Sequence, residues 1–546
     1  MVQLTGGQAL VQSLLSEGVD TIFGIPGIQL DWAYDALYAA SDKIRVVHTR
    51  HEQATAYMAD GYARSTGKVG IYLVVPGPGV LNTTGALSTA YACNAQVLCL
   101  TGQIQSDALE IGRGLLHEIP DQIGLLRHLT KWAGSALAPS EVPHLVHEAF
   151  RQMRSGRPRP TAIEIPPDVL AARREVQLSG PLPPAIEAGD PALLEQAAAI
   201  LGKAERPVII SGGGVLAAEA WTELQQLAEL LGAPVAMTAN GLGAVPASHR
   251  LGFTALGLPA LLRDADAVLA VGTRLVGLRN RTIAPPPGVP LIRIDADGTQ
   301  MYRSTPATVG IVADAKPALA SLVSLVQPQN RTRADRDSEL AALKRSLTDD
   351  MGTLEPQAHF GRVLREELPA ETIFVTESTQ VGYWMTFGGM AVEQPRTFIG
   401  SGYQGTLGNG FPTALGAQVG NPDRRVVSVN GDGGFMFNVQ ELATAVQHQI
   451  PLITIVFDDG AYGNVRRIQE NMFGGRTIAS ELKNPSFAAL GEVFGVQGLR
   501  ADGPDDLRQA LRAALAHNGP SLIEVPVGKM PMIFSHLEAR AAARTT

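Results

Sequence analysis

Short apolar runs alternate with helical segments along most of the chain, and this alternation restricts the fold more than any other feature. Runs such as VGIYLVVPGPG, RPVIISGGGV and PLITIVFDD span a few residues and end in Gly, Pro or Asp. Strands that alternate with helices usually form parallel sheets that are covered by helices on both faces. The pattern therefore predicts an α/β protein built from doubly wound parallel sheets.

The alternation occurs in three blocks, which we expect to be three domains. A chain of 546 residues is too long for a single core. The expected domains are residues 1–175, 191–326 and 357–530. A Pro-rich stretch, LSGPLPPAIEAGDP, separates the first two, and a charged connector with one helix precedes the third. The first residues, MVQLTGGQALVQSLLSEG, are expected to form an amphipathic helix.

Charge and cysteine content exclude several classes of partner. The net charge of −8 argues against nucleic acid or an anionic membrane surface. The two cysteines, Cys93 and Cys99, lie in an apolar stretch, so we expect no disulfide framework. No apolar run approaches the roughly 18 residues that a membrane span needs. These features predict a soluble protein of the cytoplasm.

Two acidic turns follow apolar strands in the third block. The first is Gly431-Asp432-Gly433-Gly434, and the second is the pair Asp458-Asp459. Glycines at a strand-to-helix turn let backbone N–H groups face an anion, and the helix N-terminus adds positive potential. Asp432 would supply a hard oxygen for Mg²⁺. Two ordinary solvated turns would explain the same residues.

The wider context resembles a known cofactor motif. The GDGG turn, the helix QELATAV, the next apolar strand and the Asp pair before Tyr462 resemble the thiamine-diphosphate binding motif. The resemblance covers nearly the whole chain, and the family is that of the acetolactate synthase-like enzymes, of the large catalytic subunit type. It implies Mg²⁺ held by Asp432, Asp459 and the backbone carbonyl of Ala461. It also implies cofactor contacts at Gly431, Gly433, Gly434 and Tyr462.

The family usually has Asn at both positions of the pair Asp458-Asp459. The departure adds negative charge, but it keeps an oxygen ligand at Asp459. We therefore expect the metal to bind, and we expect no catalytic role for Asp458.

Two more segments of the third block resemble cofactor contacts of the family. FVTESTQVGYW looks like the phosphate-binding segment of the benzoylformate decarboxylase branch, which implies contacts from Ser378, Thr379 and Gln380. SGYQGTLGNGFPTALGAQ resembles the segment that contacts the cofactor's pyrimidine ring. There the Gly405 carbonyl would accept from the 4′-amino group, and Leu407 would bend the cofactor. On its own, Leu407 is more simply a packed core residue.

Glu52 begins a helix just after a strand of the first block. An acidic residue in a first helical turn is often only a favourable partner of the helix dipole. However, RHEQATAYMADGYAR resembles the family segment whose Glu hydrogen-bonds a cofactor ring nitrogen and so activates the cofactor. The resemblance gives this role to Glu52. The next stretch, VVPGPGVLNTTGAL, implies that Pro76 and Asn82 lie beside the pyrimidine ring.

His117 and Gln29 are the expected substrate-facing residues. His117, in GRGLLHEIPDQIGLLR, could donate to a substrate carbonyl or move a proton, or it could simply pack on a domain surface. The chain has no His-His doublet of the pyruvate decarboxylase kind, which favours carboligation over simple decarboxylation. We therefore expect decarboxylation of a 2-oxo acid with carboligation. A non-oxidative 2-oxo acid decarboxylase of the benzoylformate type and a C–C bond hydrolase remain alternatives.

The resemblance also bears on flavin binding and on assembly. Related synthases bind a flavin in the middle domain, but the segments here, LGFTALGLPALLRDAD and VGTRLVGLRNRT, lack the family's flavin contacts. We expect a structural middle domain without FAD.

In the family, Glu and diphosphate sites lie on different domains that meet across a dimer interface. The resemblance therefore implies a homodimer or homotetramer with two chains in each active site.

Overall fold

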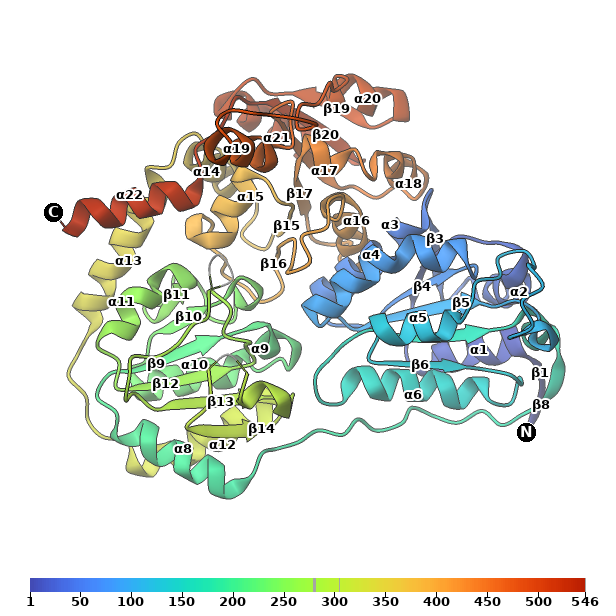
Figure 1. The fold of residues 1–546 in the computed structure, drawn as a ribbon, viewed down its shortest axis with the longest axis horizontal. Coiled ribbons are helices and arrows are strands. Elements are labelled where there is room, and N and C mark those ends of the chain that lie inside the picture. The colour runs from blue at the N-terminus through green and yellow to red at the C-terminus, as the bar shows by residue number, and fades with distance from the viewer. Residues whose placement is uncertain (278–280, 304, 546) are drawn as a thin grey trace.

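Three α/β domains follow one another along the chain (Figure 1). The computed structural model describes residues 1–277, 281–303 and 305–545. Within those ranges each domain contains one six-stranded sheet, and all the strand pairs of these three sheets are parallel. The predicted fold class is confirmed, while the exact domain boundaries stay a prediction. No described helix is long and apolar enough to cross a membrane.

The first domain surrounds the sheet of order β3-β2-β4-β5-β7-β6. Its central strands are fully buried, as both faces carry helices. The strands are β2 (Thr21–Gly24), β3 (Arg45–His48), β4 (Gly70–Val74), β5 (Val97–Gly102), β6 (Trp132–Ser135) and β7 (Thr161–Ile165). The helices are α1 (Gly6–Ser16), α2 (Asp31–Tyr38), α3 (Glu52–Thr66), α4 (Pro78–Cys93), α5 (Gln122–Leu129), α6 (Val142–Arg154) and α7 (Pro167–Ala171).

The amino terminus differs from the expected continuous helix. Strand β1 (Val2–Thr5) pairs antiparallel with β8 (Arg173–Val176), and the helix α1 begins only at Gly6. Thr5 and Gln8 form a capping box, which stops the helix from extending further toward the terminus. The strand was missed because its pairing partner lies at the far end of the domain.

The second domain has the sheet order β11-β10-β9-β12-β13-β14. Figure 1 shows it in green beside the first domain, and the extended linker runs between the two domains. The strands are β9 (Pro207–Ser211), β10 (Val235–Met237), β11 (Gly252–Thr254), β12 (Ala267–Val271), β13 (Leu291–Asp295) and β14 (Val309–Val312). The helices are α8 (Pro191–Lys203), α9 (Gly213–Ala217), α10 (Trp221–Leu231), α11 (Leu258–Arg263) and α12 (Ala315–Val326), and α13 (Asp337–Gly352) is the helix of the charged connector.

The third domain has the sheet order β16-β15-β17-β18-β20-β19. Strands β17 and β18 are neighbours, so the two acidic turns that follow them meet at one edge of the sheet. The strands are β15 (Ile373–Thr376), β16 (Phe398–Ile399), β17 (Val426–Gly431), β18 (Ile453–Asp458), β19 (Gln497–Arg500) and β20 (Ser521–Pro526). The helices are α14 (Gln357–Glu367), α15 (Gln380–Trp384), α16 (Gly410–Gly420), α17 (Asp432–Phe435), α18 (Leu442–Gln447), α19 (Gly463–Met472), α20 (Phe487–Phe494), α21 (Pro504–Ala516) and α22 (Ile533–Thr545).

Helices α3 and α16 join the first domain to the third at very close range. A Cβ atom on Gly61 would lie 1.9 Å from the carbonyl oxygen of Thr413, and one on Gly416 would lie 1.9 Å from that of Met58. Only glycine allows two helix backbones to approach this closely. The contact belongs to one apolar core that extends through both domains. It fixes the position of Glu52, the first residue of α3, relative to the third domain.

Candidate active site

The carboxyl ends of β15, β17 and β18 border a cavity of about 540 Å³. Ligand pockets in proteins usually measure about 300 to 1000 Å³, so this one has the size for a cofactor. It is lined by every residue of the third domain that the sequence predicts as a cofactor or metal contact. These residues are Ser378, Thr379, Gln380, Gly405, Leu407, Gly431, Asp432, Gly433, Gly434, Asp459, Ala461 and Tyr462.

The two acidic turns are joined by an asparagine that the sequence analysis missed. The Asn484 side-chain N–H group donates to Asp432 at 2.7 Å and to Asp458 at 2.8 Å. Burial, with a smaller contribution from Asp458, raises the pKa of Asp432 to about 7. Asn484 lies 52 residues along the chain from Asp432, and no local motif identifies it.

The two aspartates of the pair face different surroundings. Asp459 lines the cavity, and its carboxylate lies 3.7 Å from the guanidinium group of Arg466. Burial raises the pKa of Asp459, although Arg466 opposes this effect. Asp458 is absent from the cavity lining and accepts the backbone N–H of Gly460 at 3.0 Å. Asp459 can therefore contact a group bound in the cavity, whereas Asp458 bonds to the backbone of its own turn.

The residues present fit the Mg²⁺ and the diphosphate that the resemblance implies. Asp432, Asp459 and Ala461 all line one cavity, and the hard oxygen ligands that carboxylates and a backbone carbonyl can offer suit Mg²⁺. Among the described residues, no group of three or more His, Cys, Asp or Glu side chains could hold a metal. A cation here would therefore also need backbone and phosphate oxygens. Its charge would offset the burial of Asp432 and Asp459.

The first domain holds Glu52 and Asn82 in direct contact. Glu52 accepts a hydrogen bond of 3.0 Å from the Asn82 side chain, which projects from the first turns of α4. The residue before this helix, Gly77, has a left-handed φ of 60°. Pro76 and Gln29 meet at Gly102, where an added Cβ would lie 3.0 Å and 3.2 Å from their side chains.

Gln29 and His117 also meet in the first domain. The Gln29 side chain is 7% exposed, and its oxygen lies 2.9 Å from Nδ1 of His117. His117 has a left-handed φ of 68°, which is uncommon for a residue with a side chain. Its carbonyl packs on Gly77, where an added Cβ would lie 2.4 Å from that oxygen. Strained backbone of this kind is often found at functional sites.

The candidate residues of the first domain do not line the 540 Å³ cavity. The cavity lining contains neither Glu52 and Asn82 nor Pro76, Gln29 and His117. One chain therefore presents two groups of candidate residues on separate domains.

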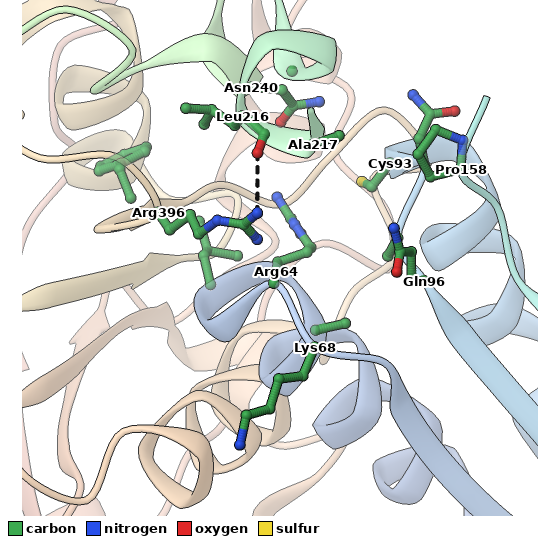
Figure 2. Close-up of a pocket in the computed structure, with 16 residues that line it drawn as sticks. Arg64, Lys68, Cys93, Gln96, Pro158, Leu216, Ala217, Asn240 and Arg396 are labelled. Atoms are coloured by element: carbon green, nitrogen blue, oxygen red, sulfur yellow. Dashed lines mark hydrogen bonds between the residues drawn. The ribbon is translucent and has the colours of Figure 1, made fainter. Parts of the chain in front are cut away.

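The glycine turn of the second domain, Gly212–Gly214, lines a smaller cavity of about 120 Å³. A neighbouring cavity of about 90 Å³ lies where the three domains meet, and Figure 2 shows Arg64 and Arg396 around it with Cys93. Both volumes are below those of usual ligand pockets. The absence of FAD stays a prediction, and residues 278–280 of the segment VGTRLVGLRNRT lie outside the described residues.

Comparison with known proteins gives family matches along most of the chain. The thiamine pyrophosphate enzyme models match as the N-terminal TPP binding domain at residues 4–125, the central domain at 194–322 and the C-terminal TPP binding domain at 378–525. Thiamine pyrophosphate is another name for thiamine diphosphate.

Three relatives match over almost their whole lengths. A probable acetolactate synthase large subunit of Methanocaldococcus jannaschii is 34% identical, over 97% of this chain and 93% of the relative. A probable 2-ketoarginine decarboxylase of Pseudomonas aeruginosa is 36% identical, over 96% and 94%. The acetolactate synthase isozyme 3 large subunit of Escherichia coli is 31% identical, over 94% and 93%. The chain therefore belongs to the thiamine pyrophosphate enzyme family and is an enzyme of the acetolactate synthase type.

Proposed function

We propose that this enzyme uses thiamine diphosphate and Mg²⁺ to decarboxylate a 2-oxo acid and to join the remaining acyl unit to a second carbonyl compound. The observation that carries the proposal is the single cavity lined by all the predicted cofactor and metal residues of the third domain. When bound, the cofactor supplies the electron sink that decarboxylation needs. The protein supplies binding, orientation and proton transfer.

Each group of residues has a distinct task in this proposal. Asp432, Asp459 and the Ala461 carbonyl hold the cation, and the glycine turn of residues 431–434 faces the diphosphate. Glu52 holds a proton at the ring nitrogen of the cofactor, and Asn82 orients its carboxyl group through the 3.0 Å hydrogen bond. His117 exchanges a proton with the substrate.

We also propose that two copies of the chain build each active site. The third domain exposes apolar side chains beside the cavity, with Leu407 37%, Phe437 48% and Val465 49% exposed. The first domain exposes Leu116, next to His117, at 63%. A homodimer that places these surfaces together would cover apolar area and unite the two groups of candidate residues. A homotetramer of two such dimers is also compatible.

A non-oxidative 2-oxo acid decarboxylase is the second candidate, because a probable 2-ketoarginine decarboxylase is 36% identical to this chain. The deciding experiment incubates the enzyme, thiamine diphosphate and Mg²⁺ with pyruvate, with 2-ketoarginine and with an aromatic 2-oxo acid. Release of CO₂ and product mass are recorded together. A carboligation product supports the main proposal, and an aldehyde alone supports the second. Full turnover by Glu52→Gln would contradict both.

A further inference from the structure

Glu377 is a buried carboxyl group at the meeting point of three segments that line the 540 Å³ cavity. It follows strand β15 and is 3% exposed. An added Cβ on Gly434 would lie 2.3 Å from both carboxyl oxygens, so the GDGG turn packs directly on this group. The segment Ser378–Gln380 follows immediately in the chain. No feature of the sequence distinguished Glu377 from its neighbours.

Glu377 also holds the loop of residues 405–410 from inside the domain. The backbone N–H of Gly408 donates to the Glu377 carboxyl at 2.5 Å. The carbonyl of the same residue accepts from the Asn438 side chain at 2.6 Å. Gly408 has a left-handed φ of 82°, and an added Cβ would lie 2.5 Å from that of Phe437. Both polar backbone groups of one loop residue are therefore bonded to buried side chains.

We propose that Glu377 is a positioning residue that joins the 405–410 loop to the GDGG turn and so shapes the cofactor cavity before the cofactor binds. The inference rests on the proposed function and on the resemblance, which implies that the Gly405 carbonyl of this loop accepts from the cofactor's 4′-amino group and that Leu407 bends the cofactor. Glu377 acts through the loop and touches no reacting atom. Asn438 provides the second bond that holds Gly408 in place.

The protonation of Glu377 is consistent with this role. Its Oε2 atom is buried and has no hydrogen-bond partner among the residues that the structure describes. Burial raises the pKa of Glu377 to about 7, although the backbone N–H groups of Gly408 and Asn409 oppose the effect. Tyr57 of α3 is a neighbouring titratable group, and burial raises its pKa also. The uncharged form, which the raised pKa favours below about pH 7, would place no negative charge against the glycine turn of residues 431–434.

The test measures thiamine diphosphate affinity with excess MgCl₂ for the whole protein, by intrinsic fluorescence. Glu377→Ala removes the acceptor and leaves the Gly408 N–H unsatisfied, so its Kd should rise about tenfold or more. Glu377→Gln keeps a neutral acceptor of the same shape, and its Kd should stay within about threefold of the original. Glu524 of β20 is the matched control, because it is also 3% exposed and accepts a backbone N–H, from Ala488. Glu524→Ala should lower the Tm without changing the Kd.

Two results would overturn the proposal. One is an unchanged Kd for Glu377→Ala, and the other is an equal loss for the Ala and Gln variants. Hydrogen exchange of the cofactor-free protein tests the role of Glu377 in the loop without relying on the proposed function. Glu377→Ala should speed exchange in residues 405–410, whereas Glu524→Ala should not. If the unmodified protein binds no thiamine diphosphate, the proposed function fails, and the exchange data still decide whether Glu377 holds the loop.

Discussion

The side chain of Gln29 holds His117 through one hydrogen bond to its ring and a second to the preceding residue. The amide N–H donates to the Leu116 carbonyl at 3.1 Å, and the amide oxygen lies 2.9 Å from Nδ1 of His117. A carbonyl oxygen can only accept, so the Leu116 contact fixes which way the amide points. The Gln29 oxygen then requires a proton on Nδ1. Nε2 is then the ring nitrogen left for the proton exchange that we propose for His117.

The first prediction concerns this pair. Gln29→Leu should lower kcat about tenfold or more, because the ring loses its fixed tautomer and orientation. His117→Gln should lower kcat at least as much. The double variant should lose little more than His117→Gln alone, because residues in one hydrogen-bonded unit are not additive. Steady-state kinetics of the three variants measure this. If the fold-loss of kcat in the double variant equals the product of the losses in the two single variants, Gln29 acts independently of His117.

The second prediction concerns Asp459, the metal ligand that we propose and that is unusual for the family. Asp459→Asn keeps an oxygen ligand, so it should retain most activity at saturating MgCl₂. Asp459→Ala removes that ligand and should raise the MgCl₂ concentration needed for half-maximal activity at least tenfold. Titration of each variant with MgCl₂ after treatment with a chelator measures the difference. Asp458→Asn is a comparison at the neighbouring position and should change the MgCl₂ requirement less than Asp459→Ala, because Asp458 does not line the cavity and is joined to Asp432 through Asn484. Complete loss in Asp459→Asn would show that the charge of Asp459 is essential.

The close contact between α3 and α16 gives a prediction of stability. Gly61→Ala places a methyl group 1.9 Å from the Thr413 carbonyl, and such overpacking costs about 1–3 kcal/mol. The Tm should fall by several degrees. Gly352→Ala, at the end of α13, is the control because an added Cβ there meets nothing within 4 Å. Thermal unfolding compares the two variants. Equal Tm values would mean that α3 and α16 move apart at little cost to accommodate the methyl group.

The raised pKa of Glu377 in the folded protein predicts how its contribution to stability depends on pH. Its pKa is about 7 in the folded protein, against an ordinary value of 4.5. The folded state therefore binds the proton more tightly, so the contribution of Glu377 to stability is fully present below about pH 4.5 and is lost as the pH rises through about 7. The raised pKa corresponds to about 3 kcal/mol. In cofactor-free protein, the Tm advantage of the unmodified chain over Glu377→Gln should shrink from pH 5 to pH 8. A constant difference would contradict the raised pKa.

Features that depend on neighbouring residues in the chain could be predicted from the sequence. Buried parallel strands are continuous apolar runs, so the strand that ends at Asp458 and the one before Asp432 were both predicted. Their adjacency brings the two acidic turns together. Contacts between distant segments could not be predicted. Strand β1 forms only because it pairs with β8. Asn484 reaches Asp432 from a segment 52 residues away, and Glu377 packs against glycines from two other segments. Nothing in the local sequence around any of them indicates these contacts.

The last prediction tests whether two chains share each active site. Glu52 is absent from the lining of the cavity that contains Asp432, so each site should combine one residue from each chain. Glu52→Gln and Asp432→Ala homodimers should both be inactive. A mixed dimer has one site with both residues intact and one site with neither, so the isolated mixed dimer should have about half of the original activity, and a randomly mixed population about a quarter. Co-expression with two different affinity tags isolates the mixed dimer for assay. An inactive mixed dimer, with both chains folded, would place Glu52 and Asp432 in the same site of one chain.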